Sequence, residues 1–369
     1  MLKAAIIGCG KIADAHATQI LRIGGCEIVA ACDRETLMAQ QLCARFPIKQ
    51  HFTDVEEMLL ATKPDVVHIT TPPGGHFAIT KLCLEHNANV YVEKPFTVDA
   101  SEARQLIEIA ERKNLKLTAG HNDQFGPAAR RMRELVRSGY LGGNVVHMES
   151  YYSYDLSDPS YARALLSDKQ HWVRQLPGKL LHNIISHGIA RVAEFFTTDR
   201  PQVIAHGFVS PLLRSIGENE IIDELRVIIS ENDQTTAYFT FSSQMKPAIH
   251  DLRIYGSKNG LILDNDHDIL LKLRGNKYKS FADKFIPPAQ FAKQHLQNLY
   301  ANVRMFLRSD FHMDSGMKYL IEAFYTSVRE NAPLPISYRE ILRTATIMDD
   351  IFEQLGKNRV QEQAILQSR

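Results

Sequence analysis

Cysteine is scarce in this sequence, and its placement excludes two kinds of stabilised fold. Five cysteines occur in 369 residues, and none belongs to a C-x-x-C pair. All five lie in the first quarter of the chain, mostly among apolar residues, at Cys9, Cys26, Cys32, Cys43 and Cys83. We therefore expect small buried side chains in a reducing compartment, with neither a disulfide framework nor a bound metal.

An excess of charge and a long apolar run are also missing. Lys and Arg total 43 against 42 for Asp and Glu, so no strong field favours nucleic acid or an anionic membrane surface. No apolar run approaches the roughly 20 residues that span a bilayer. The first residues, Met1–Gly8, enter a strand pattern directly instead of a charged region followed by an apolar one. We expect a cytoplasmic protein that binds neither nucleic acid nor a membrane.

The residues that are present predict a globular protein of two domains. The chain exceeds one typical domain in length, and 44% of its residues are hydrophobic, which allows a sizeable core. Up to about Asn122, short apolar runs alternate with helical segments such as Ser101–Lys113, which Asp99 or Ser101 could cap. Continuous apolar runs suit strands that are covered on both faces. We expect a doubly wound parallel sheet with strands at Ala4–Ile7, Glu27–Ala31, Val66–Thr70, Asn89–Val92 and Lys116–Ala119.

The rhythm changes near Asn122, and the remainder predicts another architecture. After a basic helix, successive strand patterns mostly lack helices between them and should pair antiparallel. The strands are expected at Val145–Tyr154, Gln202–Val209, Glu224–Ser230, Thr236–Ser242, Ile249–Tyr255, Gly260–Leu263 and Ile269–Leu273. The helices are expected at Pro127–Ser138, Leu180–Phe196, Gln290–Leu307, Gly316–Arg329 and Arg339–Leu355. The fold class is therefore α/β for residues 1–122, followed by an α+β domain, residues 123–369, with one large, mostly antiparallel sheet.

A glycine turn after the first strand indicates a phosphate site. Gly8–Ala13 reads G-x-G-x-x-A between a strand and a helix. The first glycine permits a tight turn, the second lets the backbone approach a pyrophosphate, and the helix start offers N–H groups at Lys11 and Ile12. An ordinary turn is the alternative.

Asp33, at the end of the second strand, lies 20 residues after Ala13. Its carboxylate can accept hydrogen bonds from the adenosine ribose and repels a 2′-phosphate, which favours NAD. Arg34 beside it could hold a 2′-phosphate, so NADP stays open.

Two further motifs extend this pattern into a family resemblance. Thr71–His76 reads T-P-P-G-G-H after one predicted strand, and Glu93-Lys94-Pro95 follows the next. With the glycine turn, they resemble the Gfo/Idh/MocA family of glucose-fructose oxidoreductase and inositol dehydrogenase relatives, whose P-x-x-x-H and E-K-P motifs they match. The late stretch Gly316–Tyr325 is similar to the final helices of that family. The resemblance implies an N-terminal Rossmann dinucleotide-binding domain, residues 1–122, and a substrate-binding and oligomerisation domain, residues 123–369.

The resemblance and the glycine turn together suggest a set of cofactor contacts. Lys94 is the most chemical of them, because an ammonium near a reacting hydroxyl favours its alkoxide-like form, and a lysine of lowered pKa could act as base. A salt bridge to Glu93 or to the pyrophosphate is the alternative. His76 could equally be structural. The full set is Gly8, Gly10, Lys11, Ile12, Asp33, Arg34, Thr71, Pro72, His76, Glu93, Lys94 and Asn122.

The second-domain signature of the family, G-G-x-x-x-D-x-x-x-H, is only partly present. His187 matches, whereas Lys179 replaces a glycine and Asn183 replaces the Asp. Positions 183 and 187 share a helix face. The resemblance implies that His187 relays the proton of a substrate alcohol, as an imidazole can near neutral pH. Asn183 can hydrogen-bond a hydroxyl but cannot act as a carboxylate, and a structural role for His187 is the alternative.

Weaker candidates for substrate contact lie before that helix. Trp172 is the only tryptophan, and its face with Arg174 and Tyr154 could stack on a sugar or nucleotide and hold a carboxylate or phosphate. A covering loop with a packed tryptophan is equally consistent with the pattern.

We expect an NAD(P)-dependent oxidoreductase that acts on a secondary alcohol of a polyol, sugar or nucleotide sugar by hydride transfer. Lys94, His187 and Asn183 form its expected catalytic set. The alternatives are a relative that uses tightly bound NAD transiently, for glycoside cleavage or internal oxidation–reduction, and a non-catalytic dinucleotide-binding regulator. The resemblance also implies a homodimer or homotetramer built on the second sheet, and the alternating apolar residues of Thr235–Phe241 fit such a face or helix packing.

Overall fold

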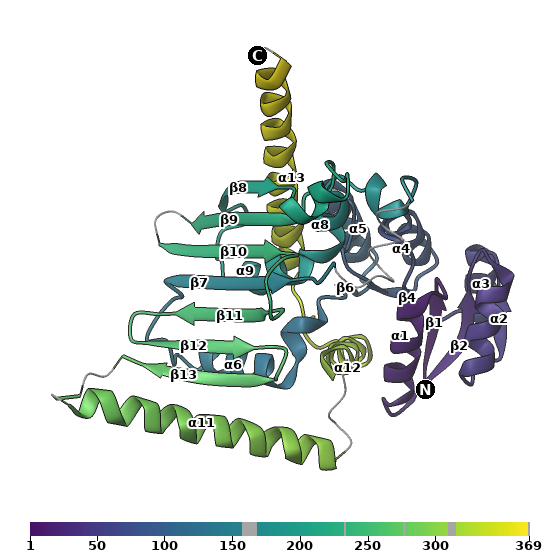
Figure 1. Ribbon diagram of the computed structural model, residues 1–369. Coiled ribbons are helices and arrows are strands. Elements are labelled where there is room, and N and C mark those ends of the chain that lie inside the picture. The colour runs from purple at the N-terminus through teal and green to yellow at the C-terminus, as the bar shows by residue number, and fades with distance from the viewer. Residues whose placement is uncertain (157–167, 232–233, 276–277, 280, 309–314, 368–369) are drawn as a thin grey trace. The chain divides into compact units, whose positions relative to one another are not determined.

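The computed structural model describes residues 1–369 except 157–167, 232–233, 276–277, 280, 309–314 and 368–369. The chain divides into two compact units (Figure 1). The first contains Met1–Asn122 and Gly316–Thr346, and the second contains Asp123–Ser315 and Ile347–Arg369. The sequence prediction differs in placing all residues after Asn122 in the second domain.

The first unit contains the predicted Rossmann sheet. Six strands pair in the order β3-β2-β1-β4-β5-β6, and every pair is parallel. The strands are β1 (Leu2–Ile7), β2 (Cys26–Cys32), β3 (Gln50–Phe52), β4 (Val66–Ile69), β5 (Asn89–Val92) and β6 (Leu117–Ala119). The main helices between them are α1 (Lys11–Leu21), α2 (Thr36–Arg45), α3 (Val55–Thr62), α4 (His76–Glu85) and α5 (Ala100–Arg112). The α/β prediction is confirmed, although β3 was not predicted.

Local signals explain where these elements begin and which face they bury. Asp99 caps α5 by accepting the N–H of Glu102 at 2.8 Å, so it rather than Ser101 satisfies the helix start. In β1, Ala4, Ala5 and Ile6 are fully buried, as expected of a central parallel strand with helices on both faces.

The late helix α12 (Ser315–Glu330) contributes buried side chains to this first unit. Phe324 and Tyr325 are fully buried, and the Tyr325 hydroxyl lies 2.8 Å from Nε2 of His68 on β4. Arg329 donates to the carbonyl of Gly25 at 2.5 Å. The sequence predicted a helix over Gly316–Arg329, but only the packing shows which sheet it contacts.

The second unit is built on a seven-stranded sheet. Its order is β13-β12-β11-β7-β10-β9-β8, with β10 and β7 parallel and the other neighbours antiparallel. The strands are β7 (His147–Ser153), β8 (Gln202–Phe208), β9 (Glu224–Glu231), β10 (Thr235–Ser242), β11 (His250–Tyr255), β12 (Asn259–Asp264) and β13 (Ile269–Arg274). The predicted mostly antiparallel sheet is confirmed.

Helices cover one face and one edge of this sheet. Figure 1 shows α6 (Pro127–Arg137) and α9 (Ser186–Ala193) behind the strands and α11 (Ala282–Leu307) along β13. The other helices are α8 (Lys179–Ile184), α10 (Pro211–Ser215) and the later part of α13 (Tyr338–Gln367).

The alternating apolar residues of β10 pack against α9. Ala237, Phe239 and Phe241 are buried, whereas Tyr238 between them is 51% exposed. A Cβ on Gly188 of α9 would lie 2.4 Å from the Phe239 ring. Helix packing therefore accounts for the apolar half of the pattern.

Candidate active site

The glycine turn of the first unit is closed by backbone at Gly8 and open at Gly10. Gly8 has φ 92°, and its N–H donates to the carbonyl of Cys32 at 2.8 Å. A Cβ on Gly8 would stand 2.7 Å from the amide nitrogen of Thr71, whereas a Cβ on Gly10 would meet nothing within 4 Å. Gly10 is the N-cap residue of α1, so no capping side chain satisfies the first N–H groups of this helix. The open side at Gly10 and the helix start fit a pyrophosphate.

The two glycines should respond differently to substitution by alanine. Gly8→Ala forces a Cβ onto the backbone at positive φ, so we expect lost dinucleotide affinity together with a free energy of unfolding lowered by about 1–2 kcal/mol or more. Gly10→Ala should leave the unfolding transition unchanged but weaken NAD binding. Calorimetric titration and thermal unfolding of both variants measure the difference, and unchanged NAD affinity in Gly10→Ala would contradict the assigned phosphate position.

Asp33 braces this turn from the end of β2. Its Oδ2 accepts the N–H of Cys9 at 2.7 Å, and its Oδ1 accepts the N–H of Glu35 at 2.9 Å. Each carboxylate oxygen keeps a second lone pair for a ligand hydroxyl. The neighbouring Arg34 side chain is 92% exposed, so it is accessible to a phosphate.

Glu93, at the C-terminal end of β5, is a buried and ionised carboxylate. Its Oε1 lies 2.9 Å from His16 Nε2, and its Oε2 accepts the N–H of Lys94 at 3.1 Å. Burial alone would raise the pKa of Glu93, but the hydrogen bond and charge of His16, together with Lys94, outweigh it and lower the pKa to about 2. Lys94 itself is half-buried. The E-K-P motif therefore places a buried carboxylate next to a lysine whose backbone N–H it accepts and whose charge lowers its pKa.

Behind Glu93, a buried hydrogen-bonded chain runs through two histidines to a tyrosine. Nδ1 of His16 lies 2.9 Å from Nδ1 of His68, whose Nε2 lies 2.8 Å from the Tyr325 hydroxyl. An ionised Glu93 only accepts, so His16 donates to it through Nε2. Burial lowers the pKa of His68 and raises that of Tyr325, which keeps both neutral.

The sequence analysis did not predict this series of hydrogen-bonded histidine and tyrosine side chains. Its only signal was polar: His16 lies on the buried face of α1, and His68 interrupts the apolar strand Val66–Ile69.

His76 ties two loops of the same unit together. It is fully buried, its Nδ1 lies 2.9 Å from the carbonyl of Pro95, and its Nε2 lies 2.9 Å from the carbonyl of Thr71. This arrangement favours a positioning role for His76 over the direct cofactor contact expected from the sequence. Pro72 lies in one of the two tied loops, and Asn122 is half-buried in the turn after β6.

The single helix predicted over Leu180–Phe196 is wrong, because the structure breaks it at Ile185. Asn183 lies near the end of α8 and is half-buried, whereas His187 lies at the start of α9 and is 9% exposed. Lys179 has φ 48°, a left-handed conformation that glycine adopts most easily. That backbone explains the glycine of the family pattern at this position.

A carboxylate outside the predicted set lies near His187. Oδ1 of Asp123 is 3.7 Å from Nδ1 of His187, and the Tyr152 ring stacks beside the imidazole with centroids 6.4 Å apart. Sequence reasoning stopped at Asn122, one residue before it. Another histidine, His182, is buried and stacks on Phe352, as a structural residue would.

The weaker substrate candidates mostly have packing roles. Tyr154 and Trp172 are partly buried against the core of the second unit. Arg174 pairs with Glu218 at 2.6 Å, and its side chain is only 9% exposed. Its charge is therefore already paired within the protein. The loop between them includes residues 157–167, which lie outside the described part.

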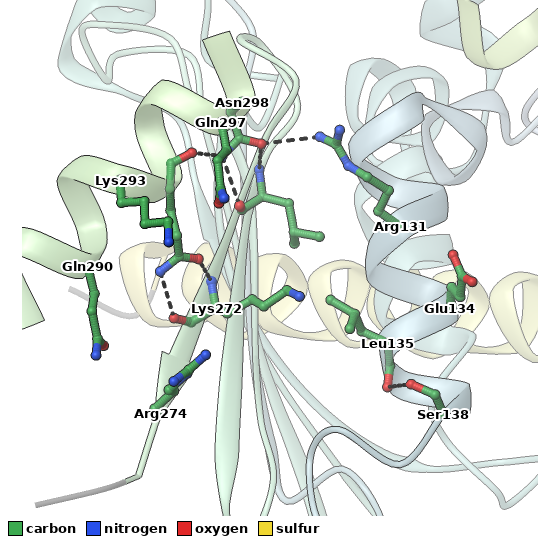
Figure 2. Close-up of a pocket in the computed structure, with 12 residues that line it drawn as sticks. Arg131, Glu134, Leu135, Ser138, Lys272, Arg274, Gln290, Lys293, Gln297 and Asn298 are labelled. Carbon is green, nitrogen blue, oxygen red and sulfur yellow. Dashed lines mark hydrogen bonds between the residues drawn. The ribbon is translucent and has the colours of Figure 1, made fainter. Parts of the chain in front are cut away.

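A groove elsewhere in the second unit contains none of the predicted site residues. Figure 2 shows this space of about 710 Å³ between α6, β13 and α11. Arg131 there donates to Oδ1 of Asn298 at 3.2 Å. The lining is polar and cationic, with Arg131, Lys272, Arg274 and Lys293 among its residues.

Comparisons with known proteins agree with the geometry of the first unit. Residues 2–121 match the family described as "Oxidoreductase family, NAD-binding Rossmann fold" (GFO_IDH_MocA). D-glucoside 3-dehydrogenase of Escherichia coli (strain K12) is 34% identical over 142 residues, 38% of this chain and 40% of that protein. UDP-N-acetylglucosamine 3-dehydrogenase of Acidithiobacillus ferrooxidans is 29% identical over 133 residues, 36% of this chain and 41% of that protein.

Solved structures extend the likeness in fold to nearly the whole chain. The WlbA dehydrogenase of Bordetella pertussis, in complex with NADH and UDP-GlcNAcA, has a TM-score of 0.77 at 14% identity and covers 97% of this chain and 96% of that one. The structure of the Acidithiobacillus ferrooxidans 3-dehydrogenase has a TM-score of 0.72 at 18% identity and covers 96% of this chain and 97% of that one.

Residues 2–121 therefore match the model of the NAD-binding domain of the Gfo/Idh/MocA oxidoreductases, in agreement with the resemblance indicated by the glycine turn and E-K-P. The matched segments span about 40% of the length of these two curated relatives.

Proposed function

We propose that this protein is an NAD(P)-dependent dehydrogenase acting on a secondary alcohol of a polyol, sugar or nucleotide sugar. The observation that carries the proposal lies in one unit. A glycine turn whose Cys9 N–H is accepted by Asp33 occurs on the same parallel sheet as the buried Glu93 and the half-buried Lys94 that follows it. Relatives named as dehydrogenases of a glucoside and a nucleotide sugar support the substrate class.

The first unit would hold the cofactor through its glycine turn. The turn and the start of α1 would bind the pyrophosphate, and Asp33 would accept hydrogen bonds from the adenosine ribose. Thr71, Pro72, Glu93 and Asn122 complete the proposed contacts. When bound, the nicotinamide accepts or returns a hydride.

Asp33 should select NAD over NADP, because its carboxylate repels a 2′-phosphate. Asp33→Asn removes the charge but keeps an acceptor for the N–H of Cys9. We expect the NAD-to-NADP affinity ratio to fall about 10-fold or more. Fluorescence titration with both cofactors measures it, and Glu35→Gln, a neighbouring exposed carboxylate, is the matched control. An unchanged ratio in Asp33→Asn would refute the assignment.

The proposed catalytic roles follow from side-chain chemistry. The Lys94 ammonium stabilises negative charge on the reacting oxygen. His187 takes the proton of the alcohol as the hydride departs, and Asn183 orients the substrate through its amide.

A dehydrogenase screen tests this function. Polyols, aldoses, glucosides and nucleotide sugars are offered with NAD and NADP in parallel, and reduced nicotinamide is followed. Net reduction with at least one class is expected. Dinucleotide that survives purification without any net reduction would instead indicate transient cofactor use.

We also propose a cytoplasmic homodimer or homotetramer. On the sheet face opposite α9, Ile204, Ile228 and Tyr238 are exposed and adjacent in register across β8, β9 and β10. Such a row is typical of a protein contact, and light scattering tests it. Within the described part of the chain, no helix is long and apolar enough to cross a membrane.

A further inference from the structure

We propose that Asp123 is a positioning residue that supplies a carboxylate partner to His187, in a chain that has Asn183 where the family pattern has an Asp. The proposal rests on the proposed function of His187 as proton relay. It accounts for how a chain with Asn183 in that place can still stabilise a charged imidazole.

The geometry places this carboxylate on one particular ring nitrogen. Oδ1 of Asp123 lies 3.7 Å from Nδ1 of His187, and the two side chains are 24% and 10% exposed. An imidazole whose Nδ1–H points to a carboxylate keeps Nε2 as its proton acceptor. The distance is longer than a hydrogen bond, but such contacts commonly tighten only when substrate binds.

The segment that carries Asp123 is fixed to the same helix as His187. Gln124, the next residue, donates to Oε2 of Glu194 at 3.0 Å and to the carbonyl of Ala190 at 3.4 Å. Arg133 of α6 also pairs with Glu194. Both partners of Gln124 belong to α9 or its C-cap, so the turn holds Asp123 at a set place beside the helix.

The next titratable group beside His187 is Tyr152, which has charged neighbours of its own. Tyr152 stacks on His187, and burial first, then the charge of Asp123, raise the pKa of this phenol, so it stays neutral. The Arg191 guanidinium lies 5.5 Å from the Tyr152 ring and donates to the carbonyls of His250 and Tyr151. The charges of Asp266 and Tyr154 also raise the pKa of Tyr152. Asp266 itself pairs with His250 at 2.7 Å.

Every atom and electron of the alcohol oxidation is accounted for when His187 takes the proton and Asp123 stabilises the resulting charge. The substrate C–H bond breaks with its electron pair leaving as hydride to the oxidised nicotinamide, a C=O bond forms, and the hydroxyl proton moves to Nε2 of His187. The imidazolium that results is stabilised by the Asp123 carboxylate at Nδ1. An amide at position 183 supplies no such charge.

The test is a set of isosteric variants read first by NMR titration of His187. Asp123→Asn should lower the pKa of His187 by about 1 unit or more, and adding Asn183→Asp should restore it at least in part. Asp123→Glu, which keeps the charge, should stay close to the parent value. The matched control is Asp350→Asn, because Asp350 pairs with the exposed Arg200 at 2.7 Å, and this variant should leave the pKa of His187 unchanged.

Turnover gives a second and separate reading. Asp123→Asn should lower kcat about 10–100-fold and shift the acidic limb of its pH profile, with KM little changed. An unchanged His187 pKa in Asp123→Asn overturns the inference whether or not substrate is turned over. A lowered pKa in a protein that oxidises no alcohol retains the pair and refutes only the proposed function.

Discussion

Replacing Lys94 by methionine will lower turnover at least about 100-fold while NAD affinity stays within a few-fold of the parent. Methionine keeps most of the length and apolar stem of lysine but removes the ammonium. The loss follows from the typical contribution of a positioned acid, base or oxyanion-stabilising charge. The neighbouring Glu93 carboxylate loses an opposite charge as well, yet its bond to His16 remains.

Steady-state kinetics with the best substrate of the screen, together with NAD titration, measures both quantities. Lys81→Met is the control, since Lys81 is half-exposed and pairs only loosely, at 4.0 Å, with Glu85 one helical turn away. Near-normal turnover in Lys94→Met would remove the catalytic role. A parallel collapse of NAD affinity would instead assign Lys94 to cofactor binding.

Replacing His16 by leucine will strip the buried Glu93 carboxylate of its partner and destabilise the first unit. Glu93 is 6% exposed and His16 fully buried, and removing one member of a buried charged or hydrogen-bonded pair costs about 3–5 kcal/mol. His16→Gln keeps an N–H donor and should cost clearly less. Urea unfolding at neutral pH measures the free energy of each variant, and equal losses would contradict the hydrogen-bond explanation.

The same carboxylate makes the free energy of unfolding depend on pH in the acidic range. The folded pKa of Glu93 is about 2, below its ordinary value of 4.5, so its contribution is fully present above pH 4.5 and is lost as the pH falls toward 2. Glu93→Gln should be less stable than the parent at neutral pH, and the difference should shrink below pH 4. A constant difference across that range would argue against an ionised Glu93.

Hydrophobic patterning predicted most of the fold because the two sheets have different requirements. Strands covered on both faces have continuous apolar runs, such as Ala4–Ile7, while those of the second sheet alternate, as in Thr235–Ser242. The edge strand Gln50–Phe52 escaped because it is three residues long and largely exposed.

What patterning could not supply was tertiary placement. The helix over Ser315–Glu330 was predicted, but its assignment to the first unit depends on Phe324 and Tyr325 filling that core. The break at Ile185 carries no proline or glycine signal. His16 and His68, far apart in sequence, meet only when α1 packs on β4.

The candidate site divides in the same way. Residues in spaced motifs, such as Gly8, Asp33 and Lys94, could be proposed from the sequence because dinucleotide binding and hydride transfer require such side chains at such spacings. Asp123 follows no motif, and only its distance from His187 indicates a role.

Tracing the hydride tests the central claim most directly. The protein is incubated with NAD or NADP and with the alcohols of the substrate screen, deuterated at the carbinol carbon. The nicotinamide is then analysed by mass spectrometry. We expect deuterium on the reduced nicotinamide when the parent protein is used, and a far lower yield of it when Lys94→Met is used. A protein that binds neither dinucleotide, or that transfers no deuterium from any member of the panel, would contradict it.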